Sequence, residues 1–207
     1  MRSIGINTLL KKKFDVYEFS DEWYESFNSP EKNFKALIYG LPGNGKTEFC
    51  IKWAKYLTKF GKVYYNSHEQ GISKSLQDAA VRNALDEVAG KLIFGNKETL
   101  TEMTDRLGRR NSPKIVFIDS LDYMNLTDGQ YKVLTERFPR KAFVIICWEK
   151  SNTPQSNYAK KIEYMADIKI RVQDFIAYPR CRFGGNIPFV IWDKPRKKNS
   201  PNLFNQL

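Results

Sequence analysis

Two patterns of apolar residues alternate along this chain. Short blocks of consecutive apolar residues are typical of buried strands, whereas apolar residues that recur every three or four positions predict helices. The blocks lie at residues 34–39, 62–67, 91–95, 114–120 and 141–148. The helical spacing covers residues 20–27, 47–60, 73–90 and 97–110. This alternation predicts an α/β fold with a mostly parallel central sheet flanked by helices.

The last third of the chain has a different pattern. Apolar segments at 166–175, 179–185 and 186–192 follow one another at shorter spacing. Closely spaced strands favour antiparallel pairing, which we expect at the C-terminal edge of the sheet. The chain is therefore predicted to contain an N-terminal lead-in segment (1–33), a core (34–193) and a basic flexible tail (194–207).

The segment between the first predicted strand and the next helix carries a phosphate-binding motif. Gly40, Gly45, Lys46 and Thr47 occupy all the fixed positions of the P-loop pattern G-x-x-x-x-G-K-[ST]. Glycine lets backbone N–H groups approach phosphate oxygens closely, and the helix that follows directs its N-terminus at them. We expect Lys46 to reach the β- and γ-phosphates of a nucleoside triphosphate, and the Thr47 hydroxyl to bind Mg²⁺. The other expected nucleotide contacts are Pro42, Gly43, Asn44 and Glu48.

Two carboxylates follow buried strands, and we expect them at the same edge of the sheet as the P-loop. Asp119 lies at the end of the strand at 114–120 and suits the Mg²⁺ side of the site. Ser120 follows it and cannot take a proton from water at neutral pH, so the catalytic base must come from elsewhere. Glu69, just after the second strand, is the candidate base, and Asp122 is a weaker alternative.

The charge of the chain predicts a polyanionic partner. The formal net charge is +11, and from residue 148 onward eleven Lys and Arg residues accompany five acids. Two polar segments, 122–130 and 149–161, are predicted to be loops that line a central channel if subunits assemble. Lys150, Lys160 and Lys161 are the candidate phosphate contacts, and Tyr158 offers a ring for base stacking.

Composition limits the remaining possibilities. With 207 residues, 42% hydrophobic and 28% charged, the chain is sized for one soluble domain. Cys50, Cys147 and Cys181 are well separated, which argues against a disulfide framework or a zinc site. No apolar run is long enough to cross a bilayer, and the N-terminal segment lacks a secretory cleavage site. We therefore expect a cytoplasmic protein without a membrane association.

The order of these motifs resembles the RecA-like ATPase core, and in particular the RadA/Sms branch and its small phage-type recombinase relatives. The resemblance covers roughly residues 20–192 and rests on GLPGNGKT, NSHEQ, IVFIDS, VIICWEK and RCRFGG. It implies ATP and Mg²⁺ as ligands, with Glu69 as the catalytic base. It further implies that Arg180 and Arg182 reach the nucleotide of a neighbouring subunit in a ring or filament on single-stranded DNA. Small cores of this kind resemble products of phages or mobile elements.

The chain departs from this family at one position, and two other functions remain open. The fourth core strand of the family usually ends in Gln or His, which senses the γ-phosphate, but here Cys147 or Trp148 occupies that position. The resemblance therefore does not imply that hydrolysis is coupled to DNA binding. A hexameric helicase or helicase-loader motor would share the same nucleotide chemistry. A small-molecule kinase would need an Arg-rich lid, and the early Arg cluster at 106–110 is in the wrong place for one.

Overall fold

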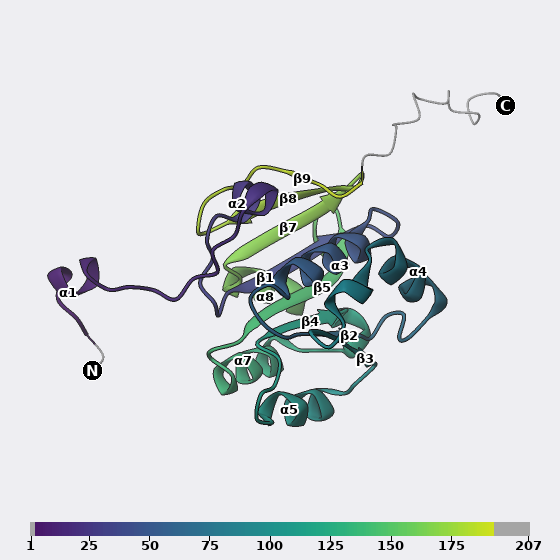
Figure 1. The fold of residues 1–207 in the computed structure, drawn as a ribbon, viewed down its shortest axis with the longest axis horizontal. Coiled ribbons are helices and arrows are strands. Elements are labelled where there is room, and N and C mark those ends of the chain that lie inside the picture. The colour runs from purple at the N-terminus through teal and green to yellow at the C-terminus, as the bar shows by residue number, and fades with distance from the viewer. Residues whose placement is uncertain (1–2, 193–207) are drawn as a thin grey trace.

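The computed structural model describes residues 3–192, so the tail predicted at 194–207 lies outside the described residues. A central sheet runs through the molecule, and helices cover both of its faces (Figure 1). The helices are α1 (Ile6–Leu10), α2 (Asp21–Phe27), α3 (Lys46–Leu57), α4 (Lys74–Arg82), α5 (Leu100–Gly108), α6 (Leu121–Met124), α7 (Asp128–Arg137) and α8 (Asn157–Met165). The strands are β1 (Lys35–Gly40), β2 (Val63–Ser67), β3 (Leu92–Asn96), β4 (Ile115–Asp119), β5 (Ala142–Lys150), β6 (Thr153–Pro154), β7 (Ile168–Gln173), β8 (Ile176–Cys181) and β9 (Phe189–Val190).

The strand order of the sheet is β3-β2-β4-β5-β1-β7-β8-β9, and β6 pairs with the end of β5. All neighbours from β3 to β7 in this order pair in parallel. β8 and β9 pair antiparallel at the edge, which confirms the fold class predicted from the sequence. Because β1, β2, β4 and β5 run in the same direction, their carboxyl ends meet at one edge of the sheet. Ser67 lies opposite Asp119 there, and Gly40 lies opposite Trp148.

Each face of the sheet buries its own apolar cluster. On one face α2 and α3 pack against the strands, and Phe27, Phe49 and Trp53 are fully buried among strand side chains. On the other face α5, α7 and α8 contribute Met103, Tyr131 and Ile162. Because both faces are covered, residues along β2 and β4 are buried in an unbroken run rather than alternately.

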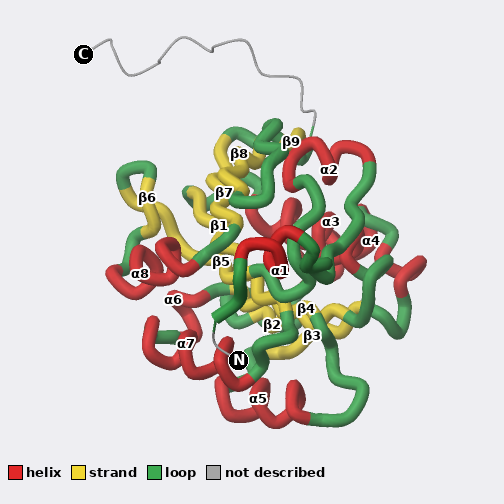
Figure 2. The backbone as a smooth tube through the Cα atoms, turned by 90° about the vertical axis from the view of Figure 1, so that its left-hand side faces the viewer, coloured by secondary structure: helices red, strands yellow, loops and turns green. Residues whose placement is uncertain are grey.

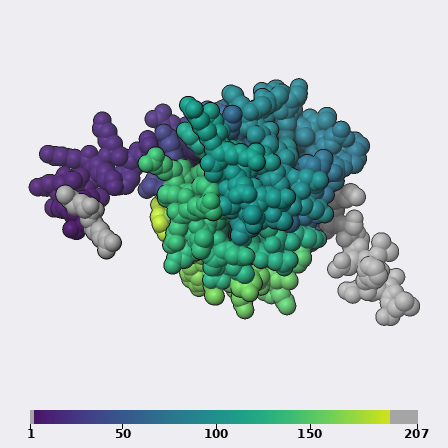
Figure 3. All heavy atoms as spheres, turned by 90° about the horizontal axis from the view of Figure 1, so that it is seen from below, coloured from purple at the N-terminus to yellow at the C-terminus, as the bar shows by residue number. Residues whose placement is uncertain are grey.

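Part of the N-terminal lead-in segment packs on the core, and part projects away from it. The Trp23 ring lies 5.0 Å from the Tyr56 ring and 4.3 Å from the Phe189 ring, so α2 is anchored to α3 and β9. In contrast, α1 buries none of its residues and extends from the body of the molecule (Figures 1 and 3). No helix within residues 3–192 is long and apolar enough to cross a membrane.

Four segments differ from the sequence prediction. The strand predicted at 179–185 coincides with β8 only over 179–181, because β8 begins at Ile176 and ends at Cys181. The predicted loop at 122–130 is wrong, because α6 and the first turn of α7 occupy most of it. The predicted loop at 149–161 is also wrong, since it contains the end of β5, β6 and the start of α8. The predicted helix at 73–90 divides into α4 and a short 3-10 helix (Leu85–Val88), because Ala84 adopts a left-handed conformation with φ 48°.

Candidate functional site at the carboxyl edge of the sheet

The P-loop follows β1 and passes directly into α3. Gly40 ends the strand where a side chain has no room, because a Cβ there would lie 2.3 Å from the carbonyl oxygen of Val172. Gly45 precedes α3 with φ 95°, a conformation that favours glycine. The Lys46 ammonium donates hydrogen bonds to the carbonyl oxygens of Gly40 (2.7 Å) and Leu41 (3.1 Å), which holds it over the loop. The backbone N–H groups at the start of α3 therefore face the same space as the ammonium group of Lys46.

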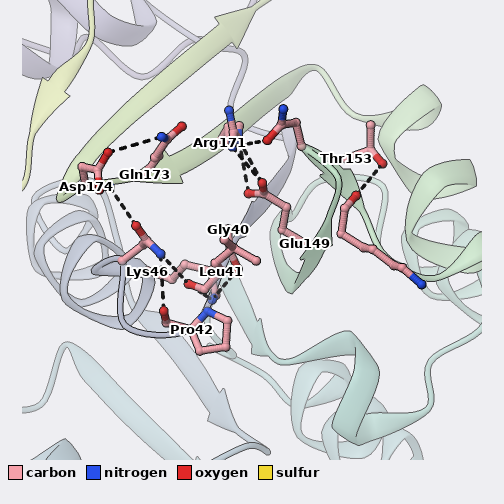
Figure 4. A network of polar contacts seen from close by, with 12 residues as sticks. Gly40, Leu41, Pro42, Lys46, Glu149, Thr153, Arg171, Gln173 and Asp174 are labelled. Atoms are coloured by element: carbon pink, nitrogen blue, oxygen red, sulfur yellow. Dashed lines mark hydrogen bonds and ion pairs between the residues drawn. The ribbon is translucent and has the colours of Figure 1, made fainter. Parts of the chain in front are cut away.

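The turn between β7 and β8 supports the P-loop from the side. The Asn44 side-chain oxygen accepts the Asp174 N–H at 2.8 Å, and the Asn44 carbonyl accepts the Phe175 N–H at 3.2 Å. Asp174 and Phe175 have φ values of 51° and 60°, as in a tight two-residue hairpin turn. Figure 4 shows the resulting contact between the loop and the hairpin. The antiparallel edge of the sheet thus helps to fix the shape of the phosphate-binding loop.

A cavity of about 330 Å³ lies beside the P-loop and brings both predicted carboxylates to it. It is lined by Pro42, Gly43, Gly45, Lys46, Thr47, Glu48, Glu69, Gln70, Ser75, Ala79, Arg82, Asp119, Phe175 and Trp192. Asp119 enters from β4 and Glu69 from the segment after β2. The Glu69 N–H donates to the Asp119 carbonyl at 2.9 Å, so the backbones of these two segments are joined at the cavity.

Asp119 is a buried carboxylate with a perturbed acidity. Its side chain accepts a hydrogen bond from the Tyr65 hydroxyl at 2.5 Å, and only 4% of the residue is exposed. The pKa of Asp119 is raised to about 6, mainly because the carboxylate is buried and in part because of the charge of Glu69. The Tyr65 hydrogen bond and the Lys46 ammonium lower the pKa, and they only partly offset the burial. Such a carboxylate gains from a cation that binds to it.

The donor set at the cavity fits Mg²⁺ when phosphates complete the coordination. Thr47 and Asp119 offer hard oxygen ligands, and Glu69 lies in the same cavity. Among residues 3–192, no group of three or more His, Cys, Asp or Glu side chains is placed to hold a metal ion by itself. Mg²⁺ typically takes one or two protein oxygens, with substrate phosphates and water as the remaining ligands. The protein residues present are of the right kind and number for that arrangement.

Comparison with known proteins agrees with this architecture. Among solved structures, the chain is similar to the flagellar accessory protein FlaH from Methanocaldococcus jannaschii, with 14% sequence identity and a TM-score of 0.58. That match covers 82% of this chain and 88% of the other. The fold is RecA-like.

A second solved structure also matches. The ATPase domain of G40P matches at 17% identity and a TM-score of 0.47, over 68% of this chain and 69% of that chain. No protein-family model and no curated protein sequence matches the chain.

The predicted arginines lie away from the cavity of their own chain. Arg180 is exposed on β8, opposite Lys169 of β7. Arg182 follows β8 and forms an ion pair with Asp167 at 2.8 Å, next to the amino end of β1. In this RecA-like structure neither arginine lines the cavity that holds Lys46. Their predicted role therefore concerns the nucleotide of another copy.

The candidate nucleic-acid contacts gather around α8. Lys150 is exposed at the end of β5, and Tyr158 and Lys160 are exposed on the first turns of α8. Lys161 is also on α8, where its ammonium lies 3.4 Å from the carboxylate of Asp128. This ion pair joins the starts of α7 and α8, so the two segments predicted to line a channel do lie together.

The last part of β5 holds the position where the resemblance stated from the sequence led us to expect a γ-phosphate sensor. Cys147 is fully buried, and the Trp148 N–H donates to the Asp122 carboxylate at 2.8 Å. Glu149 is buried and forms an ion pair with Arg171 of β7 at 2.8 Å, as Figure 4 shows. The strand end is therefore tied to α6 on one side and to β7 on the other. Asp122, the alternative base, is engaged with this backbone.

Several residues of the cavity were not predicted from the sequence. Arg82 reaches it from α4 and pairs with Glu48 at 3.0 Å. Phe175 and Trp192 form an aromatic pair at its rim, with ring centroids 6.1 Å apart. These residues come from segments far apart in the sequence and belong to no local motif, so only the folded structure brings them together.

Proposed function

We propose that this chain binds and hydrolyses ATP and binds DNA, as a RecA/RadA-like protein that acts in recombination, repair or replication. The observation that carries the proposal is the composition of one cavity, where Lys46, Thr47, Asp119 and Glu69 meet at the carboxyl edge of the sheet. A phosphate-binding cation, oxygen ligands for a metal and a separate carboxylate are the groups that phosphoryl transfer to water requires.

In the proposed mechanism each group has one task. The P-loop amides and Lys46 hold the β- and γ-phosphates in position. Mg²⁺ bound by Thr47 and Asp119 would supply charge neutralisation at the phosphate oxygens. Glu69 orients the attacking water and accepts its proton. Asp119 is engaged by Tyr65 and assigned to the metal, and Glu48 is paired with Arg82 at 3.0 Å. We therefore assign Glu69, the third carboxylate that lines the cavity, to the water.

The proposal assigns Arg180 or Arg182 to the nucleotide of a neighbouring copy in a homo-oligomer. A guanidinium placed there would stabilise charge that develops on the transferred phosphoryl group. Arg182 pairs with Asp167, but its side chain is 66% exposed, and ion pairs of that kind contribute at most about 1 kcal/mol. The arginine can therefore exchange this partner for a phosphate at little cost.

The aromatic pair at the rim suits the nucleobase. Phe175 lies against Gly45 of the P-loop, with a ring carbon 2.9 Å from the position of a Cβ on that glycine. Phe175 and Trp192 both line the cavity, and the sheet order places the turn between β7 and β8 on the far side of β1 from β2, the strand that precedes Glu69. Aromatic rings stack on any base, so this pair supports binding of a nucleoside triphosphate without fixing the choice of base.

Single-stranded DNA is the proposed partner of the surface around α8. Lys150 and Lys160 offer cations for the phosphate backbone, and Tyr158, which is 46% exposed, offers a ring for base stacking. The net charge of +11 favours such a partner in general.

The test is to measure ATP turnover, oligomer size and binding to a single-stranded oligonucleotide on the same preparation. We expect Mg²⁺-dependent phosphate release, and a larger assembly when ATP and the oligonucleotide are both present. Absence of turnover under all conditions would refute the ATPase assignment. Turnover without any oligonucleotide affinity across a salt series would refute the DNA assignment alone. Phosphate transfer to a nucleoside or metabolite would instead favour a kinase.

A further inference from the structure

Lysines mark the start of five neighbouring strands at the amino edge of the sheet, the edge opposite the P-loop. Lys35 is the first residue of β1, and a lysine directly precedes each of the other four strands. In the order of the sheet, β3-β2-β4-β5-β1, these residues are Lys91, Lys62, Lys114, Lys141 and Lys35. We call them the lysine row.

Hydrogen bonds between neighbouring strands show that members of the row are adjacent in space. The Lys114 N–H donates to the Lys62 carbonyl at 3.0 Å, and the Lys114 carbonyl accepts the Ala142 N–H at 2.9 Å. The Lys91 carbonyl likewise accepts the Val63 N–H at 2.8 Å. Because neighbouring strands are about 4.8 Å apart, five strand starts extend over about 19 Å. The row is much longer than a single phosphate group.

A groove of about 860 Å³ lies along this edge, beside the middle of the row. We call it the amino-edge groove. Its lining includes the cations Lys32, Lys114, Arg137, Arg140 and Lys141 and the acids Asp15 and Glu31. Lys32 is paired with Asp15 at 3.2 Å. Within residues 3–192, no ion pair involves Lys114, Arg137 or Arg140. The groove therefore carries unneutralised positive charge.

The lysines in the centre of the row are crowded together. The Lys141 ammonium donates to the Ser112 hydroxyl at 2.8 Å and to the Pro113 carbonyl at 2.6 Å. Burial lowers the pKa of Lys141, and the neighbouring charge of Lys114 lowers it further. Burial also lowers the pKa of Lys35 to about 8, and the charge of Asp167 partly offsets this effect. An anion in the groove would relieve the repulsion between Lys114 and Lys141, which both line it.

The N-terminal segment adds cations on the same side of the molecule. Asp15 and Tyr17 line the groove, and the exposed residues Lys11, Lys12 and Lys13 lie just upstream, separated from Asp15 by one residue. Figure 2 views the molecule from this side, with α1 in front of the body. Phe60 and Phe138, which are partly exposed, contribute ring surface to the groove.

We propose that the amino-edge groove and the lysine row bind the sugar–phosphate backbone of a nucleic-acid strand. The charge is extended along several strands rather than focused in one pocket, which matches a chain of phosphates better than a single anionic metabolite. This site lies at the amino edge of the sheet, whereas the surface around α8 follows the carboxyl end of β5. The two sites are therefore separate. The amino-edge site depends on neither ATP hydrolysis nor the assignment of Glu69.

The test compares two variants of the full chain that change the net charge equally. Lys114→Gln combined with Arg140→Gln removes two cations from the groove. Lys132→Glu changes the charge by the same amount at an exposed position of α7 that does not line the groove. Binding of a labelled oligonucleotide, single-stranded in one series and duplex in the other, is measured across a salt series.

The expected effect follows from counterion release. Each phosphate contact contributes about 0.7 to the salt slope for a single strand, so losing two contacts lowers the slope by about 1.4. If the double variant and the wild type bind equally at 1 M salt, this change in slope makes the double variant bind about 25-fold more weakly at 0.1 M salt. Lys132→Glu should leave both the slope and the affinity near those of the wild type. A loss in one series that is absent from the other identifies the strand type that the groove binds.

A second measurement locates the contact without mutation. Acetylation of lysines by an N-hydroxysuccinimide ester, read by mass spectrometry, should show that the oligonucleotide protects Lys114 but not Lys132. Three outcomes would overturn the proposal. The double variant could bind as tightly as the wild type, it could lose no more affinity than Lys132→Glu, or the protein could bind neither strand type. Displacement of the oligonucleotide by polyglutamate, added at an equal concentration of negative charges, would also overturn the proposal. The groove would then bind acidic chains in general. ATP turnover is measured in parallel, and its absence would bear only on the proposed function.

Discussion

Burial of the Asp119 carboxylate in the candidate site predicts that this carboxylate lowers the stability of the folded protein. The carboxylate is buried at the end of β4, and its pKa rises from the model-compound value of 3.8 to about 6. The folded state therefore holds the proton more tightly than the unfolded state. Stability is lost as the pH rises through the interval between the two pKa values, and the loss is complete above about pH 6. We expect Asp119→Asn to remove this dependence.

The magnitude follows from the size of the shift. A difference of about 2 pKa units at about 1.36 kcal/mol per unit corresponds to about 3 kcal/mol in total. Between about pH 4.5 and pH 7, the stability of Asp119→Asn relative to the wild type should rise by about 2 kcal/mol. The new amide can accept the Tyr65 hydroxyl, and any cost of its unpaired NH₂ group does not vary with pH. The change with pH is therefore a cleaner test than the stability at one pH.

The assay is urea unfolding of wild type and Asp119→Asn in parallel, at several pH values, without nucleotide or divalent cations. Asp105→Asn is the control, because Asp105 is exposed on α5 and surface substitutions usually change stability by less than about 0.5 kcal/mol. A difference between wild type and Asp119→Asn that stays constant with pH would refute the reasoning. It would mean that Asp119 is not desolvated in solution as it is in the structure.

Three further predictions follow from contacts at the site. Gly45→Ala forces φ 95° on a residue with a side chain and places its Cβ 2.9 Å from the Phe175 ring, so the urea midpoint should fall by an amount equivalent to about 2 kcal/mol, with weaker nucleotide binding. Arg171→Met leaves the buried Glu149 carboxylate unpaired, so the free energy of unfolding measured by calorimetry should fall by about 3 kcal/mol. Arg171→Met combined with Glu149→Gln should recover most of that loss, because no unpaired charge is then buried. Mg²⁺ affinity measured with a fluorescent nucleotide should fall about tenfold per pH unit below about pH 6, because protonated Asp119 does not ligate, and a pH-independent affinity would contradict this.

The elements that the sequence predicted well are those with a strong local pattern. The strands around Ile38 and Phe117 are apolar throughout because helices cover both faces of the sheet. The P-loop is contiguous in sequence, so its position after β1 could be predicted from the residues alone. Placement of Asp119 at the same edge followed from the parallel direction of the strands.

The elements that the sequence failed to predict have weak or interrupted patterns. α7 buries only Tyr131 and Leu134, and α8 buries only Ala159 and Ile162, so neither shows a continuous apolar stripe. The start of α7 did carry a usable signal, since Thr127 and Gln130 form a capping box. In the cavity, Arg82 and Phe175 arrive through long-range packing that no local motif encodes.

The central claim is that Glu69 is the catalytic base of an ATPase, and one pair of variants tests it most directly. Glu69→Gln preserves the shape of the side chain but removes its basicity, and Asp122→Asn makes the same change at the alternative carboxylate, which accepts the Trp148 N–H. We expect Glu69→Gln to bind ATP and Mg²⁺ with near wild-type affinity while single-turnover hydrolysis falls by about 100-fold or more. Asp122→Asn should retain hydrolysis within a few-fold of the wild type. Near-normal hydrolysis by Glu69→Gln, with loss of hydrolysis in Asp122→Asn, would contradict the account.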